Sequence, residues 1–171
     1  MPRPRLSPDK WILAGLDALA ATGPMALAAE PLARALKTTK GSFYWHFKDV
    51  PAFHEALLTQ WQARALEQVL TQVQDRGDAD VRLRSFGHGI LGDSVEPKLR
   101  IWAQTDARVS AALAEVDAER LRYLTRLLSQ MGLRNPDFAR AMQATLIGLP
   151  LSSDRQTAPF DTLVDTILAL Q

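Results

Sequence analysis

Proline and glycine residues divide this sequence into segments of helical length, and that division limits the possible folds more than any other feature. Ser7-Pro8 is a helix start, with proline at the first helical position, and Gly23-Pro24 is a stop, so the spacing predicts a helix over 8–22. No stretch alternates β-branched residues between hairpin turns. The predicted fold class is therefore all-α, with further helices near 29–36, 39–47, 51–76, 80–92, 97–104, 106–131, 136–149 and 159–170.

The composition is that of a globular chain without thiol chemistry. Of the 171 residues, 47% are hydrophobic and 23% are charged, and the lack of cysteine excludes disulfides, CxxC zinc sites and iron–sulfur clusters. The longest run without a charged residue is shorter than the roughly 18 apolar residues of a membrane span. Asp17, inside an amphipathic helical pattern, argues against a signal peptide. We therefore expect a cytoplasmic protein with no membrane partner.

The small net charge of +1 hides an asymmetry along the chain. Residues 1–50 hold seven Lys and Arg against four acidic residues, whereas residues 51–171 hold 13 against 15. A basic N-terminal end is the part to examine for a polyanionic partner, although a solvated basic surface would give the same count. Arg3 and Arg5 form a short arm that could reach a DNA minor groove.

Two short predicted helices, over 29–36 and 39–47, are separated by about three residues, as in a helix-turn-helix. The second helix could enter the DNA major groove, which is about 12 Å wide. Phe43 and Phe47 are four residues apart and are expected to face the core, so the opposite side of the helix faces outward. The candidate DNA-binding residues are Thr39, Lys40, Gly41, Ser42, Tyr44, His46 and Lys48.

Each outward residue type has a use on DNA. Lys40 could bind a phosphate or the acceptor atoms of guanine, Ser42 could bond a base edge, and Tyr44 could donate its hydroxyl to a phosphate. Gly41 lets the backbone approach closely. The alternative is that Tyr44, Trp45 and His46 pack against the helix expected over 51–76. For Trp45 we adopt this packing interpretation.

In these residues the sequence resembles the tetracycline-repressor (TetR) family of transcription regulators. The family pattern is a helix ending in Gly, then Ile-Ala, a Gly-Val turn, a polar cap, and Leu-Tyr-aromatic-aromatic-Phe followed by Lys. In this chain the corresponding residues are Gly23, Leu32-Ala33, Lys37-Thr38, Thr39 to Ser42, and Phe43-Tyr44-Trp45-His46-Phe47-Lys48. The resemblance implies a DNA-binding domain over 1–50 and a helical effector-binding and dimerisation domain over 51–171.

Three positions depart from the family pattern. Lys37 stands where the family usually has a Gly in left-handed conformation, which costs other residues roughly 1 kcal/mol. Val50 replaces a Lys or Arg that the resemblance implies would touch a phosphate, and Lys48 is the candidate substitute. Ala28 replaces a Thr cap, so the helix over 29–36 is expected to be less secure.

The last two predicted helices are apolar on more than one face, so one face needs a partner beyond the subunit core. The resemblance implies that these helices pair with their twofold mates in a homodimer. The alternative is a deeply buried core in a monomer. The candidate dimer-interface residues are Ala141, Thr145, Gly148, Leu163, Ile167 and Leu170.

The resemblance also implies a pocket for a small-molecule effector in the C-terminal half, although core packing is an alternative for every aromatic residue there. Gly87 and Gly89 are expected to leave space beside His88. Arg120 lies on an apolar helical stripe and must be paired, with Asp117 and Asp106 as candidate partners. The candidate ligand-binding residues are Phe86, His88, Trp102, Tyr123 and Met142.

No pattern in the sequence predicts an enzyme. The three histidines are too dispersed for a metal triad, His54-Glu55 lacks HExxH spacing, and there is no phosphate loop or nucleophile elbow. We therefore expect no catalytic residue, metal or cofactor. The predicted function is a sequence-specific transcription regulator that binds a duplex DNA operator with an inverted repeat. The resemblance implies a repressor released by an effector, and a helical protein-interaction adaptor without DNA binding is the alternative.

Overall fold

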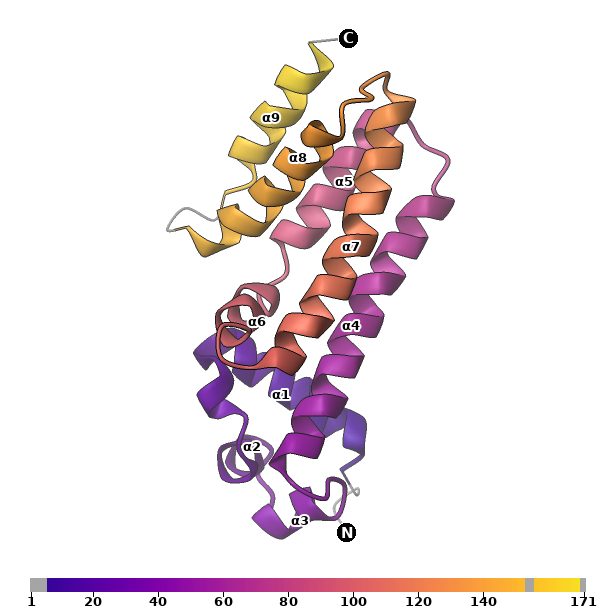
Figure 1. The fold of residues 1–171 in the computed structure, drawn as a ribbon. Coiled ribbons are helices and arrows are strands. Elements are labelled where there is room, and N and C mark those ends of the chain that lie inside the picture. The colour runs from indigo at the N-terminus through magenta and orange to yellow at the C-terminus, as the bar shows by residue number, and fades with distance from the viewer. Residues whose placement is uncertain (1–5, 153–155, 170–171) are drawn as a thin grey trace. The chain divides into compact units, whose positions relative to one another are not determined.

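A computed structural model describes residues 6–152 and 156–169 of the chain. All regular elements in this part of the chain are helical, so the predicted all-α fold class is confirmed (Figure 1). The elements are α1 (Pro8–Thr22), η1 (Pro24–Ala26), α2 (Ala29–Ala35), α3 (Lys40–Tyr44), α4 (Val50–Gln74), α5 (Ala79–Leu91), α6 (Glu96–Trp102), α7 (Ala107–Gln130), α8 (Pro136–Gly148), η2 (Leu149–Leu151) and α9 (Ala158–Leu168).

The helices form two compact units. The first contains the described residues up to 63 together with 98–113, and the second contains 64–97 together with 114 onward. The first unit extends beyond residue 50 because Phe53 and Leu57, on the first turns of α4, are fully buried in its core.

The core of the first unit is a cluster of aromatic rings around Phe43 of α3. The Phe43 ring packs edge-on against Trp11 at 5.4 Å and Phe53 at 5.3 Å, and it contacts Phe47 at 5.3 Å between centroids. Gly15 lets α1 come close to α4, because a Cβ at this position would lie 2.6 Å from Cζ of Phe53. The predicted inward orientation of Phe43 and Phe47 is confirmed, since both are buried.

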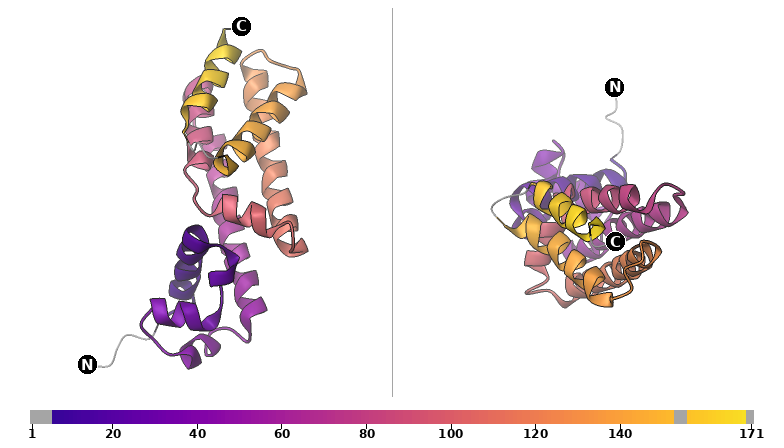
Figure 2. Two further views of the ribbon diagram at one scale, coloured as in Figure 1. Left: turned by 90° about the vertical axis from the view of Figure 1, so that its left-hand side faces the viewer. Right: turned by 90° about the horizontal axis from the view of Figure 1, so that it is seen from above.

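In the second unit, α5, α8 and α9 lie side by side (Figure 2). Phe160 of α9 is fully buried, and its ring occupies the space that a side chain at Gly87 of α5 would need. The expectation that Gly87 leaves room for a ligand beside His88 is therefore wrong, because Phe160 fills that room. Gly89 is exposed, and a Cβ there would meet only the end of the Gln68 side chain, at 3.9 Å.

A buried ion pair joins α6 to α7 within the second unit. Arg120 Nη1 donates to Glu96 Oε2 at 2.7 Å, and both side chains are about 4% exposed. The expectation that Arg120 needs a counter-charge is confirmed, and Glu96 is a partner that we did not predict. Asp106 instead pairs with Arg108 at 2.7 Å, and the guanidinium holds the pKa of this carboxyl below its usual range.

The two glycines of α5 give a matched pair of variants. Gly87→Ala should lower the free energy of unfolding by about 1–3 kcal/mol, because the new methyl group overlaps the Phe160 ring in a filled core. Gly89→Ala should raise it by about 0.5–1 kcal/mol, because alanine is the better helix former and the site is open. Urea unfolding followed by circular dichroism measures both, and equal effects would contradict this packing.

Candidate nucleic-acid interface

The turn between α2 and α3 is a Schellman motif with a lysine in the left-handed position. Lys37 has φ +52°, and its N–H donates to the Arg34 carbonyl at 3.1 Å, while the Thr38 N–H donates to the Ala33 carbonyl at 2.9 Å. The left-handed conformation expected at Lys37 is therefore confirmed. These two hydrogen bonds use the last carbonyls of α2 and turn the chain toward α3.

Helix α3 is short and has a polar cap. The Thr39 hydroxyl accepts a hydrogen bond from the Ser42 N–H at 3.3 Å, which satisfies one of the free donors at the start of the helix. The helix ends at Tyr44 rather than near Phe47, and the N–H groups of His46 and Phe47 both donate to the Phe43 carbonyl at 3.0 Å. This tight turn lets Phe47 re-enter the core.

The start of α2 depends on a histidine from α4. Ala28 stands at the N-cap of α2 without a side-chain hydrogen bond, as expected from the missing Thr. His54 lies 3.0 Å from the carbonyl of Leu27 through Nε2, and because a carbonyl only accepts, the His54 ring must donate. The same ring packs edge-on against Trp102 at 5.0 Å, which places Trp102 in the first unit.

The predicted DNA-binding residues lie on the accessible side of α3 and its flanks. Lys40, Gly41, Tyr44 and Lys48 are exposed, whereas Ser42 and His46 are half-buried. Thr39 is exposed at the start of the helix. The buried position of Phe43 between these residues fixes which side of α3 can meet another molecule.

Trp45 corrects the sequence interpretation. Its side chain is 82% exposed, so it does not pack against α4 as we predicted. The signal that could have found this is helical geometry, because a residue two positions after buried Phe43 lies about 200° around a helix from it.

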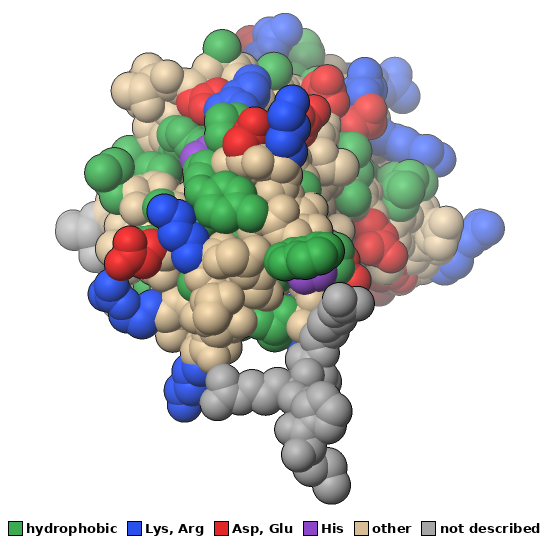
Figure 3. Space-filling view, turned by 90° about the horizontal axis from the view of Figure 1, so that it is seen from below, with side chains coloured by type: hydrophobic (Ala, Val, Ile, Leu, Met, Phe, Trp, Pro, Cys, Tyr) green, Lys and Arg blue, Asp and Glu red, His purple; other side chains and the backbone are tan. Residues whose placement is uncertain are grey.

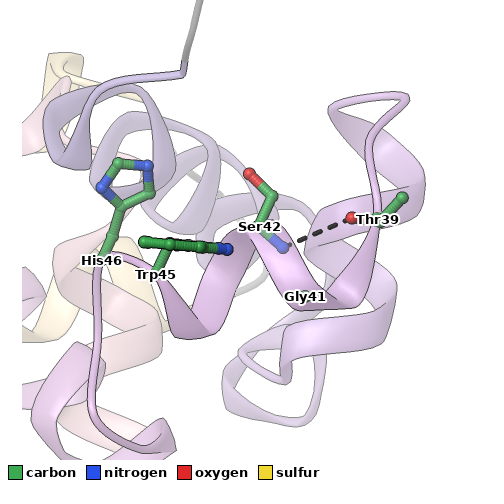
Figure 4. Close-up of a pocket in the computed structure, with 5 residues that line it drawn as sticks. All are labelled: Thr39, Gly41, Ser42, Trp45 and His46. Carbon is green, nitrogen blue, oxygen red and sulfur yellow. Dashed lines mark hydrogen bonds between the residues drawn. The ribbon is translucent and has the colours of Figure 1, made fainter.

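Trp45 and its neighbours border a surface hollow of about 560 Å³ (Figure 4). Figure 4 shows the indole of Trp45 edge-on, with the His46 ring and the Ser42 hydroxyl on the same side of its plane. The residues that line the hollow are Thr39, Gly41, Ser42, Trp45 and His46. An aromatic surface therefore lies next to hydrogen-bonding groups.

The electrostatic character around the hollow is positive. The segment 31–48 holds Arg34, Lys37, Lys40 and Lys48 and no acidic residue. Arg34 pairs with Glu30 at 3.2 Å, on the outer surface of α2. Figure 3, which views the molecule from the end where Figure 1 places α3, shows exposed hydrophobic side chains between separate Lys and Arg side chains.

The predicted effector-binding residues are divided between the two units. Phe86 and Tyr123 pack at 4.7 Å between ring centroids, and Met142 is buried in the same core, whereas Trp102 contacts His54. Burial raises the pKa of Tyr123, so it remains a neutral phenol.

His88 lies on the surface of α5 rather than in this core. Its Nε2 lies 2.8 Å from Oδ1 of Asp161 on α9. Arg84, one turn earlier on α5, pairs with Asp161 at 3.4 Å and with Asp165. These charged side chains hold α9 against α5.

The predicted dimer-interface residues differ in exposure. Ala141 and Gly148 are exposed on α8, and Thr145 and Leu163 are half-buried. Ile167 is 3% exposed in the core of its own subunit, so it cannot supply surface to a partner in this conformation. Leu170, and Arg3 and Arg5 of the predicted minor-groove arm, lie outside the described residues.

Two kinds of site are absent from the described part of the chain. No group of three or more His, Asp or Glu side chains there is arranged to hold a metal ion. No helix there combines the length and the apolar character that crossing a membrane requires.

Comparison with known proteins relates this fold to one class. No protein-family model matches the sequence, and no curated protein matches it significantly. A solved structure from Rhodococcus sp., described as a TetR-family transcriptional regulator, has a TM-score of 0.74 at 21% identity over 95% of this chain and 97% of its own.

Two other solved structures of transcriptional regulators have a similar fold. A TerR/AcrR-family transcriptional regulator from Aquifex aeolicus has a TM-score of 0.67 at 10% identity, covering 95% of both chains. The fatty acid degradation regulator FadR from Bacillus halodurans also has a TM-score of 0.67, at 17% identity over 95% of this chain and 98% of its own. The architecture is that of an all-α protein with an N-terminal helix-turn-helix. The chain has the fold of TetR-family regulators.

Two variants of His54 separate its hydrogen bond from its ring packing. His54→Phe keeps an aromatic ring against Trp102 but leaves the Leu27 carbonyl without its donor, and it should lower the free energy of unfolding by about 1–2 kcal/mol. His54→Ala loses both contacts and should cost more. Urea unfolding measures the difference, and a His54→Phe variant as stable as the parent would contradict a role for the hydrogen bond.

Proposed function

We propose that this chain is a cytoplasmic, sequence-specific transcriptional regulator that binds duplex DNA and has no catalytic activity. In this proposal residues 1–50 are the DNA-binding domain, and residues 51–171 bind an effector and dimerise. The observation that carries the proposal is the accessible side of α3, which buried Phe43 holds outward within a segment free of acidic residues. The fold shared with solved transcriptional regulators supports it.

The residues of this face divide into two roles. Lys40, Lys48 and the hydroxyl of Tyr44 bind phosphates, which position the protein on the duplex without reading its sequence. Thr39, Ser42 and His46 offer hydrogen-bonding groups to base edges in the major groove, and Gly41 lets the helix backbone approach. Lys48 supplies the cation that Val50, at the start of α4, does not.

A homodimer supplies the second half of the DNA contact. The exposed small residues of α8, Ala141 and Gly148, together with half-buried Leu163 of α9, form the surface that a twofold mate would cover. Such an isologous pair makes the operator an inverted repeat, because each recognition helix meets the same sequence in opposite orientation.

A small-molecule effector would act by binding one arrangement of the dimer more tightly than the other, and the coupling to DNA must be reciprocal. The core around Phe86, Tyr123 and Met142 is the place for such a ligand within the second unit. Because these side chains are packed together, a ligand would enter by displacing them. In this proposal the effector releases the regulator from DNA, as a repressor requires.

Salt dependence tests the DNA contact. A duplex is first selected from a random-sequence pool by the full chain, and its affinity is then measured by fluorescence anisotropy at several salt concentrations. Affinity should fall steeply with salt, because each neutralised phosphate releases counterions and contributes about 0.9 to the slope. Lys40→Ala should weaken binding and reduce the slope by about one phosphate contact.

The control for Lys40→Ala is Arg126→Ala, which removes one exposed cation from α7 of the other unit. It should leave both the affinity and the slope unchanged. An affinity that does not vary with salt would contradict the proposed phosphate contacts. A chain that retains no duplex but still captures a protein would favour the adaptor alternative.

Light scattering tests the dimer. The full chain of 18.9 kDa should give twice that mass at micromolar concentration. Gly148→Glu should give the monomer mass, because it places a charge on the α8 surface while the site itself has open space around it. Gly89→Glu, at an exposed glycine of α5, is the matched control and should remain dimeric. A monomeric parent chain would refute this part of the proposal.

A further inference from the structure

The position of Trp45 is unusual among the tryptophans of this chain. Trp11, Trp61 and Trp102 are buried, whereas Trp45 is 82% exposed. A large apolar ring that remains in water is the kind of side chain that gains most from being covered by a partner. Trp45 follows directly after α3, so whatever covers it also meets the recognition helix.

The hollow beside the indole combines apolar and polar groups in a small space. The indole face forms one wall, and the Ser42 hydroxyl and the His46 ring lie on the same side of it (Figure 4). Thr39 and Gly41 complete the lining. A ligand that fits this chemistry presents a small apolar group next to hydrogen-bonding atoms.

Apart from Lys40, helix α3 lacks the side chains that usually read bases by paired hydrogen bonds. Its sequence, Lys-Gly-Ser-Phe-Tyr, contains no Arg, Asn or Gln. Lys40 can bind guanine acceptors, but it binds phosphate equally well. Sequence discrimination must therefore come largely from other contacts, and the exposed indole is the largest of these.

Thymine is the base whose major-groove edge carries a methyl group, and that methyl lies beside the O4 acceptor. We propose that the indole face of Trp45 reads the C5-methyl group of one thymine in each operator half-site, while Ser42 and His46 bond polar atoms of the same A·T pair. This inference rests on the proposed DNA-binding function and names a base that the site selects.

The charge around the hollow favours DNA over a protein as the molecule that covers Trp45. The segment 31–48 holds four cations and no acidic residue, and Lys40 and Lys48 are exposed on either side of Trp45 in the sequence. Phosphates on both sides of a thymine would meet such cations. A protein partner remains an outcome of the test below.

Removal of a single methyl group tests the inference. In a duplex selected by the full chain from a random pool, each thymine of one half-site is replaced in turn by deoxyuridine, which lacks only the methyl group. At one position the affinity should fall about fourfold, the factor for one buried methyl-sized group. With Trp45→Ala, the thymine and uracil duplexes should bind equally at that position, and more weakly than the parent binds thymine.

Met25→Ala is the matched control, because Met25 is 90% exposed on η1 and apolar but lies outside α3 and the hollow. It should keep the parent preference for thymine over uracil. Since the Trp45 side chain is exposed, Trp45→Ala should also keep the parent unfolding midpoint, which separates loss of the contact from loss of the fold.

The outcomes separate this inference from the proposed function. If the parent chain retains no duplex, the DNA-binding function fails and the inference fails with it. If duplex is retained but no deoxyuridine position changes the affinity, the inference alone is refuted. A Trp45→Ala variant with parental DNA affinity also refutes it, because the indole then makes no contact that contributes to DNA binding.

Discussion

Phe43 is fully buried and packs edge-on against Trp11 and Phe53, so one ring anchors α3 to α1 and to α4. A five-residue helix has too few hydrogen bonds to be stable alone and takes its stability from tertiary packing. The direction of the Phe43 side chain therefore fixes the orientation of every other residue of α3. The outward surface of α3 is the consequence of a core contact.

In the turn before α3, one residue, Lys37, combines an unfavourable backbone conformation with a positive charge. Lys37 holds a left-handed conformation that costs a non-glycine residue roughly 1–2 kcal/mol. The hydrogen bonds from Lys37 to Arg34 and from Thr38 to Ala33 stabilise it. Glycine would relieve the strain, but lysine adds a cation next to α3. The missing cap at Ala28 is a second local weakness in this motif, and the His54 contact with Leu27 holds the chain at that point.

In the second unit, two contacts that the sequence did not predict depend on partners distant along the chain. The sequence predicts that Arg120 must be paired, because it is a charge on an apolar stripe, but its contact with Glu96 spans 24 residues. Ile167 is apolar, as an interface residue would be. It faces its own core because α9 packs against α5, with Phe160 beside Gly87.

The sequence by itself determined the helical class, the helix boundaries to within a few residues and the inward side of α3, because capping, proline and glycine chemistry and helical periodicity act over four residues or fewer. The left-handed turn at Lys37 was expected only from the resemblance to a family that usually has Gly there. Only the tertiary structure shows that the Phe160 ring occupies the space beside Gly87, while the space beside Gly89 is open. It also shows that Glu96 pairs with Arg120 and that His54 donates to the Leu27 carbonyl before α2. These contacts depend on which helices pack against each other, and the spacing of residues within one helix does not predict that packing. Trp45 lies between the two cases: its outward direction follows from Phe43 and helical geometry, but only the packed structure shows that no neighbouring helix covers most of its surface.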